Sequence, residues 1–252
     1  MAMVTVLSEL AVSSPISRRL PVIPNVVALG IFGSTGDGIN GNRIPGGPAF
    51  SDFSGGGAAP PLTHSACRTV NTARSSAFSG IDTGIVRNAA ILAGGYTAFV
   101  IARTCPGVPA QLMSDGTNIA WLTLAIQAAN PDVGGHAALI IGTPGVRPRT
   151  YDLGVGVSVH NWKFLAMSAA GGGASAKAHD VTDGLSFETA ITTTLTAITQ
   201  PFTIGSPIAT SFWQAADIAA FGFSNSILDL ASLQSIRAQL APALNRRGVT
   251  GF

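Results

Sequence analysis

The C-terminal end of the chain constrains the fold most, because a strand there leads directly into a single capped helix. Residues 215–223 combine small and apolar side chains in a pattern typical of a strand. After a short turn, Asp229 stands where an N-cap belongs, with a carboxylate able to accept from free N–H groups of the first turn. The apolar residues that follow recur at helical spacing: Leu230, Leu233, Ile236, Leu240 and Leu244. This pattern predicts a helix with one buried face.

The end of this helix is also specified by the sequence. Pro242 removes a backbone donor, so we expect a kink or fraying in the last turn. Arg246 and Arg247 suit the negative end of the helix, and Gly248 suits the left-handed position that follows it. The helix is therefore expected to end just before Gly248.

Upstream of the helix, short apolar runs alternate with Gly-rich joints, and no long helical period occurs before Asp229. The candidate strands are residues 26–32, 66–71, 95–103, 110–114, 120–127, 137–142, 155–159, 164–169, 174–179, 186–192, 200–205 and 216–223. Residues 33–61 are expected to form a long loop that contains one or two short strands. Many short strands separated by turns predict an all-β antiparallel sandwich spanning residues 26–252.

Residues 1–25 differ from the rest, because prolines and polar residues break any regular pattern there. We expect an extended N-terminal arm. Two interpretations stay open: a terminus without fixed structure, or a segment that docks the domain on a neighbour.

The composition indicates an unusually neutral surface. Charged residues make up 10% of the 252-residue chain, with a net charge of +2, against roughly 25% in an average soluble protein. Little charge opposes association, so partner subunits or a homo-oligomer are expected. A clustered basic face is missing from the sequence, which argues against nucleic-acid binding. Its apolar runs are too short for a bilayer span, and residues 1–25 lack a secretory signal pattern, so neither membrane insertion nor export is expected.

Four segments together resemble the laminin-G-like, concanavalin A-like jelly-roll domains found in phage and bacterial proteins. They are LAGGYTAFVIAR (92–103), NWKFLAMS (161–168), FTIG (202–205) and ADIA (216–219), followed by the C-terminal helix. The resemblance covers residues 26–252 and implies a jelly roll closed by that helix. Ala220 stands where the family has an acidic residue, which weakens any polar role carried over to this end of the chain.

The glutamates argue against catalysis. A glycoside hydrolase on a jelly roll needs two carboxylates that face each other across a groove. The chain has only Glu9, in the arm, and Glu188, and the E-x-D-x-x-E arrangement of jelly-roll glucanases is absent. We therefore expect a protein that is not an enzyme and has no cofactor other than a possible calcium ion.

The calcium hypothesis rests on Asp180 and Asp183, which lie close together in the sequence DVTDG. Calcium sites need several oxygen ligands, usually from two or more carboxylates. The alternative, which we favour, is a hairpin turn in which Asp183 and Gly184 supply the turn residues.

The two cysteines, Cys67 and Cys105, are too few for a disulfide framework or a four-cysteine zinc site. Buried free thiols are the simpler interpretation. A Cys67–Cys105 pair stays possible if their strands are neighbours.

Exposed aromatic side chains could bind sugars. Trp121 and Trp162 lie in apolar strands and are expected in the core. Trp213, Tyr96 and Tyr151 are the candidates for glycan contact.

Three functional hypotheses follow. The first is a structural virion protein, such as a phage head-decoration, fibre or tail-appendage subunit, located in the virion and bound to other virion subunits. The alternative is a carbohydrate-binding, lectin-like module without catalysis, at a cell surface or in an extracellular assembly. The third and weakest is a degenerate hydrolase.

Overall fold

The computed structural model describes residues 25–32, 43–54, 68–70, 79–104, 110–115, 121–127, 136–143, 146–153, 161–191, 193–205 and 216–252. Several sequence predictions lie outside these residues. They are the arm up to residue 24, the strand at 155–159, the Cys67–Cys105 pair and Trp213.

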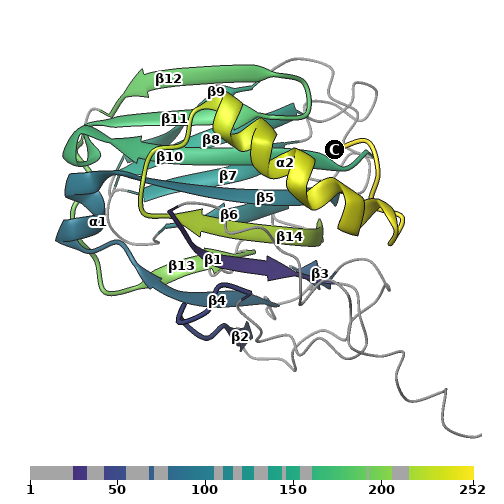
Figure 1. The fold of residues 1–252 in the computed structure, drawn as a ribbon. Coiled ribbons are helices and arrows are strands. Elements are labelled where there is room, and N and C mark those ends of the chain that lie inside the picture. Colours follow the sequence, from purple (N-terminus) through teal and green to yellow (C-terminus); the bar gives the residue numbers. More distant parts are fainter. Residues whose placement is uncertain are drawn as a thin grey trace, which may run out of the picture.

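The described residues form two antiparallel seven-stranded sheets that pack face to face (Figure 1). The front sheet has the order β1 (Val26–Ile31), β14 (Ala216–Ser224), β5 (Tyr96–Thr104), β10 (Lys163–Ala170), β11 (Ser175–Asp180) and β12 (Leu185–Ala190), with β3 (Arg68–Val70) also paired to β14. The back sheet has the order β2 (Ser51–Ser54), β4 (Ser79–Val86), β13 (Pro201–Ile204), β6 (Ala110–Ser114), β7 (Trp121–Gln127), β8 (His136–Thr143) and β9 (Val146–Asp152). The predicted fold class, an all-β antiparallel sandwich of the jelly-roll type closed by a C-terminal helix, is confirmed.

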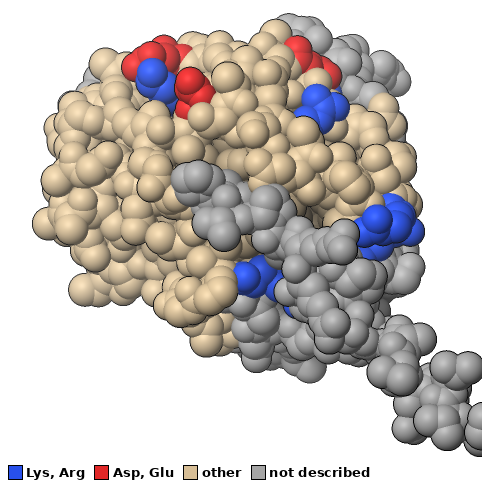
Figure 2. Space-filling model, viewed as in Figure 1, with Lys and Arg blue, Asp and Glu red and all other residues tan. Residues whose placement is uncertain are grey.

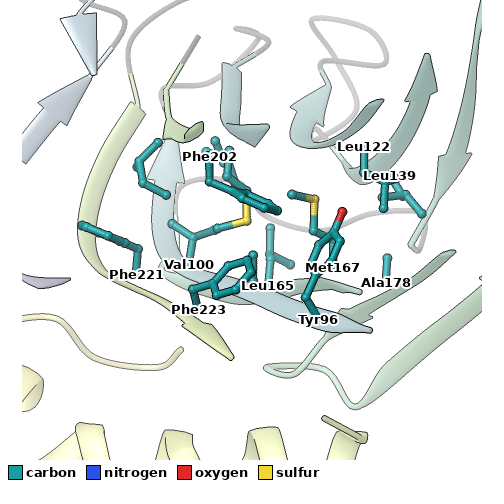
Figure 3. Packing of buried hydrophobic residues seen from close by; sticks show 14 of the residues in the cluster. Tyr96, Val100, Leu122, Leu139, Leu165, Met167, Ala178, Phe202, Phe221 and Phe223 are labelled. Atoms are coloured by element: carbon teal, nitrogen blue, oxygen red, sulfur yellow. The ribbon is translucent and has the colours of Figure 1, made fainter. Parts of the chain in front are cut away.

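Alternation along β5 divides the hydrophobic residues into two layers, because successive side chains of a strand point to opposite faces. Tyr96, Ala98 and Val100 face the back sheet and belong to the main core between the sheets, where Figure 3 shows Tyr96 and Val100. Phe99 and Ile101 face the other way, into a second cluster under the C-terminal helix. Strand β5, in the middle of the front sheet, is therefore buried on both faces.

The C-terminal helix α2 (Leu230–Asn245) crosses the front sheet as the sequence predicts (Figure 1). The Asp229 carboxylate accepts from Ser232 N at 2.8 Å. At the other end, Gly248 has φ +81°, and its N–H donates to the Asn245 carbonyl at 3.0 Å. These contacts confirm the predicted cap and stop, while Pro242 lies inside the helix without ending it.

The face that carries α2 is largely uncharged where its residues are described, with a few charged groups spaced apart (Figure 2). This agrees with the low charged fraction of the sequence. In the described part of the chain, no helix is long and apolar enough to cross a membrane.

The structure also contains elements that the sequence pattern did not predict. These are β4, β9, the short helix α1 (Ala89–Gly94) and the 3-10 turn η1 (Gly171–Gly173). The single C-terminal helix that was predicted to close the sandwich is α2, and α1 is a short helix of 6 residues that carries no long helical period. A glycine inside β4, Gly84 with φ +67°, and a proline inside β9, Pro148, are residues that normally argue against a strand.

Candidate functional site

The candidate site lies along one open side of the sandwich, where both sheets end. In the described part of the chain, β12 pairs only with β11, and β9 pairs only with β8. In Figure 1, these two strands are the uppermost ones of the front and back layers. Side chains from both sheets therefore meet at this rim.

The meeting point is an aromatic pair. Tyr151 of β9 and Phe187 of β12 have ring centroids 5.0 Å apart and planes inclined by 30°, a stacked arrangement. Both side chains are half-buried and pack against the main core on their inner side. A pair of rings that is half-buried at an edge leaves apolar surface within reach of a ligand.

The Tyr151 hydroxyl carries the polar part of the site. Hydrogen bonds from the side chains of Thr189 and Arg149 lower the pKa of Tyr151 below its ordinary value, because both groups stabilise the ionised oxygen. Thr189 follows Phe187 by two residues, and Arg149 precedes Tyr151 by two, so each shares its neighbour's face of the strand. We call Arg149, Tyr151, Phe187 and Thr189 the rim cluster.

The opposite face of β12 holds the only glutamate outside the predicted arm. Glu188 Oε2 lies 2.9 Å from Lys177 Nζ of β11. Since Glu188 alternates with Phe187 and Thr189 along the strand, its carboxylate points away from the rim cluster. The acidic charge of β12 is therefore paired on the outer face.

Asp180 and Asp183 lie on the hairpin between β11 and β12 and hold a lysine between them. Lys163 Nζ is 2.6 Å from Asp183 Oδ2 and 3.5 Å from Asp180 Oδ2. Burial raises the pKa of Asp180, and a backbone hydrogen bond from Asp183 opposes this shift. Residues 181–184 form a turn in which Gly184 has φ +72°, so the hairpin interpretation is confirmed.

Calcium would have to displace the Lys163 ammonium from these carboxylates. The described residues contain no cluster of three or more His, Cys, Asp or Glu that could hold a metal ion. Calcium binding at Asp180 and Asp183 stays a prediction, and the geometry gives it no further ligand.

His179 and Ser186 form a second polar pair, on the outer face of β11 and β12. Their Nδ1 and Oγ atoms lie 2.7 Å apart. The buried Nε2 of His179 has no hydrogen-bond partner, whereas a hydrolytic triad requires a carboxylate that orients the histidine. Burial lowers the pKa of His179, and the nearby Lys177 adds to this effect.

Tyr96 is a correction to the predicted glycan contacts. It is 0% exposed, with its ring 5.1 Å from that of Phe202 and 5.6 Å from that of Phe223 (Figure 3). Its hydroxyl donates to Asp115 Oδ2. A side chain enclosed in this way cannot reach a sugar in solution, so its selection as a contact was wrong.

Asp115 completes a buried ion pair around Tyr96. Arg87 Nη1 lies 2.5 Å from Asp115 Oδ2, with both side chains fully buried. Arg87 Nε donates to the Thr196 carbonyl at 3.0 Å, and Leu122 N donates to Asp115 Oδ1 at 2.6 Å. Because these polar atoms are satisfied by other parts of the fold, the network is structural.

Of the three tryptophans, one lies in the core, and the side chains of the other two are outside what the structure describes. Trp162 is 5% exposed and lies in the cluster under α2, with the Arg103 guanidinium 4.6 Å from its ring. Its predicted core position is confirmed. The side chain of Trp121 and all of Trp213 lie outside what the structure describes.

Comparison with known proteins identifies the fold and leaves the family open. No family model and no curated protein sequence matches the chain. Among solved structures, the chain is similar to the botulinum neurotoxin serotype D binding domain, with a TM-score of 0.59 and 9% identity over 86% of this chain and 51% of that one. The chain is also similar to the binding domain of serotype D/C VPI 5993, with a TM-score of 0.57 and 10% identity over 85% of this chain and 52% of that one.

A third similar structure is the binding domain of botulinum neurotoxin DC in complex with SialylT. It has a TM-score of 0.55 and 9% identity over 86% of this chain and 52% of that one. The chain therefore spans about half the length of the structures it matches. At this identity, the likeness shows a shared β-sandwich and nothing about shared residues. Nothing in these comparisons supports a virion role, which stays a prediction.

The sequence pointed to Tyr151 but missed the rest of the rim cluster. Phe187 and Thr189 alternate within a predicted strand, and this pattern marks one face without showing what lies opposite. Arg149 follows Pro148, in a segment that was not recognised as a strand. The signal that could have revealed the cluster is an aromatic residue on the edge strand of each sheet. The edge strands can be recognised only when the strand order is known.

Proposed function

We propose that this protein is a carbohydrate-binding module without catalysis and that the rim cluster contacts the sugar. The observation that carries the proposal is the aromatic pair of Tyr151 and Phe187, half-buried at the open side of the sandwich. A sugar presents an apolar C–H face together with hydroxyl groups. Aromatic rings bind the C–H face of the sugar, and the hydroxyls of Tyr151 and Thr189 can form hydrogen bonds with its hydroxyl groups.

The similar structures support this proposal in a general way. They are binding domains: one belongs to botulinum neurotoxin type C, whose cell entry depends on interaction with two ganglioside molecules, and another is in complex with SialylT. Those chains are about twice as long as the matched region, so the likeness does not locate their ligands on this fold. The position of the sugar here is argued from the rim cluster alone.

The described side chains also support a role without catalysis. Glu188 is paired with Lys177 on the outer face, and Asp180 and Asp183 are paired with Lys163. Carboxylates engaged in this way are poorly suited to act as the two opposed groups of a glycosidase.

Glycan-array binding and titration calorimetry with three variants test the proposal. Tyr151→Leu keeps an apolar side chain but removes the ring, and we expect it to weaken binding about fivefold, since an aromatic contact contributes about 1 kcal/mol. Tyr151→Phe keeps the ring and should bind within a few-fold of the wild type. Ile227→Ala removes an exposed apolar group beside α2, 38% exposed, and should bind as the wild type does.

Two results would contradict the proposal. One is a wild-type protein that binds no glycan with or without calcium. The other is a Tyr151→Leu variant that remains folded, by thermal unfolding, and binds every ligand as the wild type does.

The virion hypothesis is a separate candidate, favoured by the low charged fraction of 10%. It places the protein in a particle, with residues 1–25 as the docking arm and residues 26–252 as the domain. Deleting the arm should then abolish incorporation into the particle and leave the sandwich folded. A stable monomer that never enters a particle would contradict it.

A further inference from the structure

The charge of the rim cluster indicates what kind of sugar it would accept. Arg149 is exposed at this rim. The ion pairs among the described residues do not include it. Its interaction within the cluster is with the Tyr151 hydroxyl, a neutral group near physiological pH. The guanidinium therefore brings a positive charge to the rim that no described carboxylate neutralises.

The nearest acidic side chain on β12 does not compensate for this charge. Glu188 lies on the opposite face of the strand, where Lys177 already binds it at 2.9 Å. Phe187 and Thr189, which share the rim face, are uncharged. The rim is therefore a cationic group beside an aromatic surface and two hydroxyls.

We infer that the rim cluster selects an acidic sugar, with Arg149 binding its carboxylate or sulfate while Tyr151 and Phe187 carry the apolar face of the ring. This inference rests on the proposed function. A guanidinium presents its donors as a planar fork that matches a carboxylate or sulfate in two parallel hydrogen bonds. The Tyr151 hydroxyl supplies a further donor beside the anion, whereas Thr189 Oγ1 donates within the fold, to the Ala190 carbonyl at 3.3 Å.

The lowered pKa of Tyr151 agrees with this arrangement. Thr189 and Arg149 both stabilise negative charge on the phenolic oxygen. Donors that stabilise a negatively charged phenolate oxygen also stabilise a negatively charged oxygen of a ligand bound beside it.

Two matched pairs of oligosaccharides test the inference by calorimetry. One pair is oligogalacturonate and its methyl ester, which share a sugar and differ in charge. The other is a dextran sulfate oligosaccharide and unsulfated dextran of the same length. We expect the wild type to bind the charged member of at least one pair about tenfold more tightly, corresponding to one charge-assisted contact. The pair that shows the preference identifies the anion as carboxylate or sulfate.

Substitutions at Arg149 assign the preference to this residue. Arg149→Gln should remove the preference, so that the charged and the neutral member of each pair bind with similar affinity. Arg149→Lys should retain part of it, because the charge remains and the fork is lost. Arg246→Gln makes the same change in net charge at an exposed position after α2, and should keep the full preference.

The possible failures are distinguishable. If a neutral glycan binds in a Tyr151-dependent way but neither pair shows a preference, the inference is wrong and the proposed function stands. A preference that persists in Arg149→Gln also overturns the inference. If no glycan binding depends on Tyr151, both the inference and the proposed function fail.

Discussion

The two tyrosines of this chain stand in opposite environments. Tyr96 is enclosed between the sheets and donates its hydroxyl to the buried carboxylate of Asp115. Tyr151 lies half-buried at the open rim, and its hydroxyl is bonded to Thr189 and Arg149. Burial raises the pKa of Tyr96 well above its ordinary value, whereas the pKa of Tyr151 is lowered.

The difference shows that the partner and the burial of a hydroxyl decide its role more than the residue type does. Tyr96 and Asp115 are fully buried, and their described hydrogen bonds join them to other buried groups of the protein. Their interactions therefore serve stability. Tyr151 keeps part of its surface in solvent. No ion pair among the described residues includes its hydrogen-bond partner Arg149. We therefore assign a stabilising role to Tyr96, and the environment of Tyr151 agrees with the proposed binding role.

The largest expected effect comes from breaking the buried network around Tyr96. Asp115→Ala removes the carboxylate and leaves the Arg87 guanidinium buried without its partner. We expect a loss of about 3–5 kcal/mol in the free energy of unfolding, typical of a broken buried ion pair. Chemical denaturation measures this, and a loss below about 1 kcal/mol would show that the network is not structural.

A smaller effect should separate the two hydroxyls directly. Tyr96→Phe leaves Asp115 with one buried hydrogen bond fewer, at a cost of about 1–2 kcal/mol. Tyr151→Phe changes a half-exposed position and should cost less than about 0.5 kcal/mol. Equal losses in the two variants would remove the distinction drawn between them.

The ionisation of the two phenols provides a spectroscopic version of the same contrast. In a pH titration followed by ultraviolet difference absorption, Tyr151 should ionise below its ordinary pKa of about 10. Tyr96 should stay protonated until the protein unfolds. Tyr151→Phe should remove the early transition, and an early transition that persists in this variant would contradict the assignment.

The raised pKa of Tyr96 also fixes the sign of an alkaline effect on stability. Its protonated form is favoured in the folded protein, so this contribution is fully present below the unfolded pKa of about 10 and is lost as pH rises further. In Tyr96→Phe, the free energy of unfolding should fall less steeply as the pH rises above this value. Thermal unfolding across this pH range measures it, and an unchanged slope in the variant would count against the burial of Tyr96.

The smallest expected effect concerns His179, a buried polar group near the same rim but on the outer face. Its pKa is lowered mainly by burial, so the neutral ring is favoured in the folded protein. Stability should therefore fall as pH drops below the unfolded value of about 6.5. His179→Gln should reduce this acid sensitivity, whereas greater stability of the wild type at lower pH would reverse the sign.

The sequence predicted the elements whose signals are local. Asp229 and Gly248 define the ends of α2 through hydrogen bonds to residues within a few positions, and these signals can be read from the chain itself. Short apolar runs likewise marked β5, β6 and β10. Strands β4 and β9 were missed because Gly84 and Pro148 resemble interruptions in a short window.

The candidate site could be predicted only in part, because its contacts join distant strands. Tyr96 lies in a predicted strand and Tyr151 in a segment that the pattern did not mark as one, and no local pattern shows which of the two rings is buried. The hydroxyl of Tyr96 is satisfied by a network with Asp115 and Arg87, which directly follow β6 and β4. The partners of Tyr151 on β12 become visible only once the order of strands in both sheets is known.

The most direct test of the account is to map a bound glycan onto the fold. Amide chemical shifts of the labelled protein, recorded during titration with the tightest ligand from the array, report which strands the ligand contacts. The account predicts that the perturbed residues gather on β9 and β12 around Tyr151 and Phe187. Perturbations confined to the α2 face, with β9 and β12 unchanged, would contradict it.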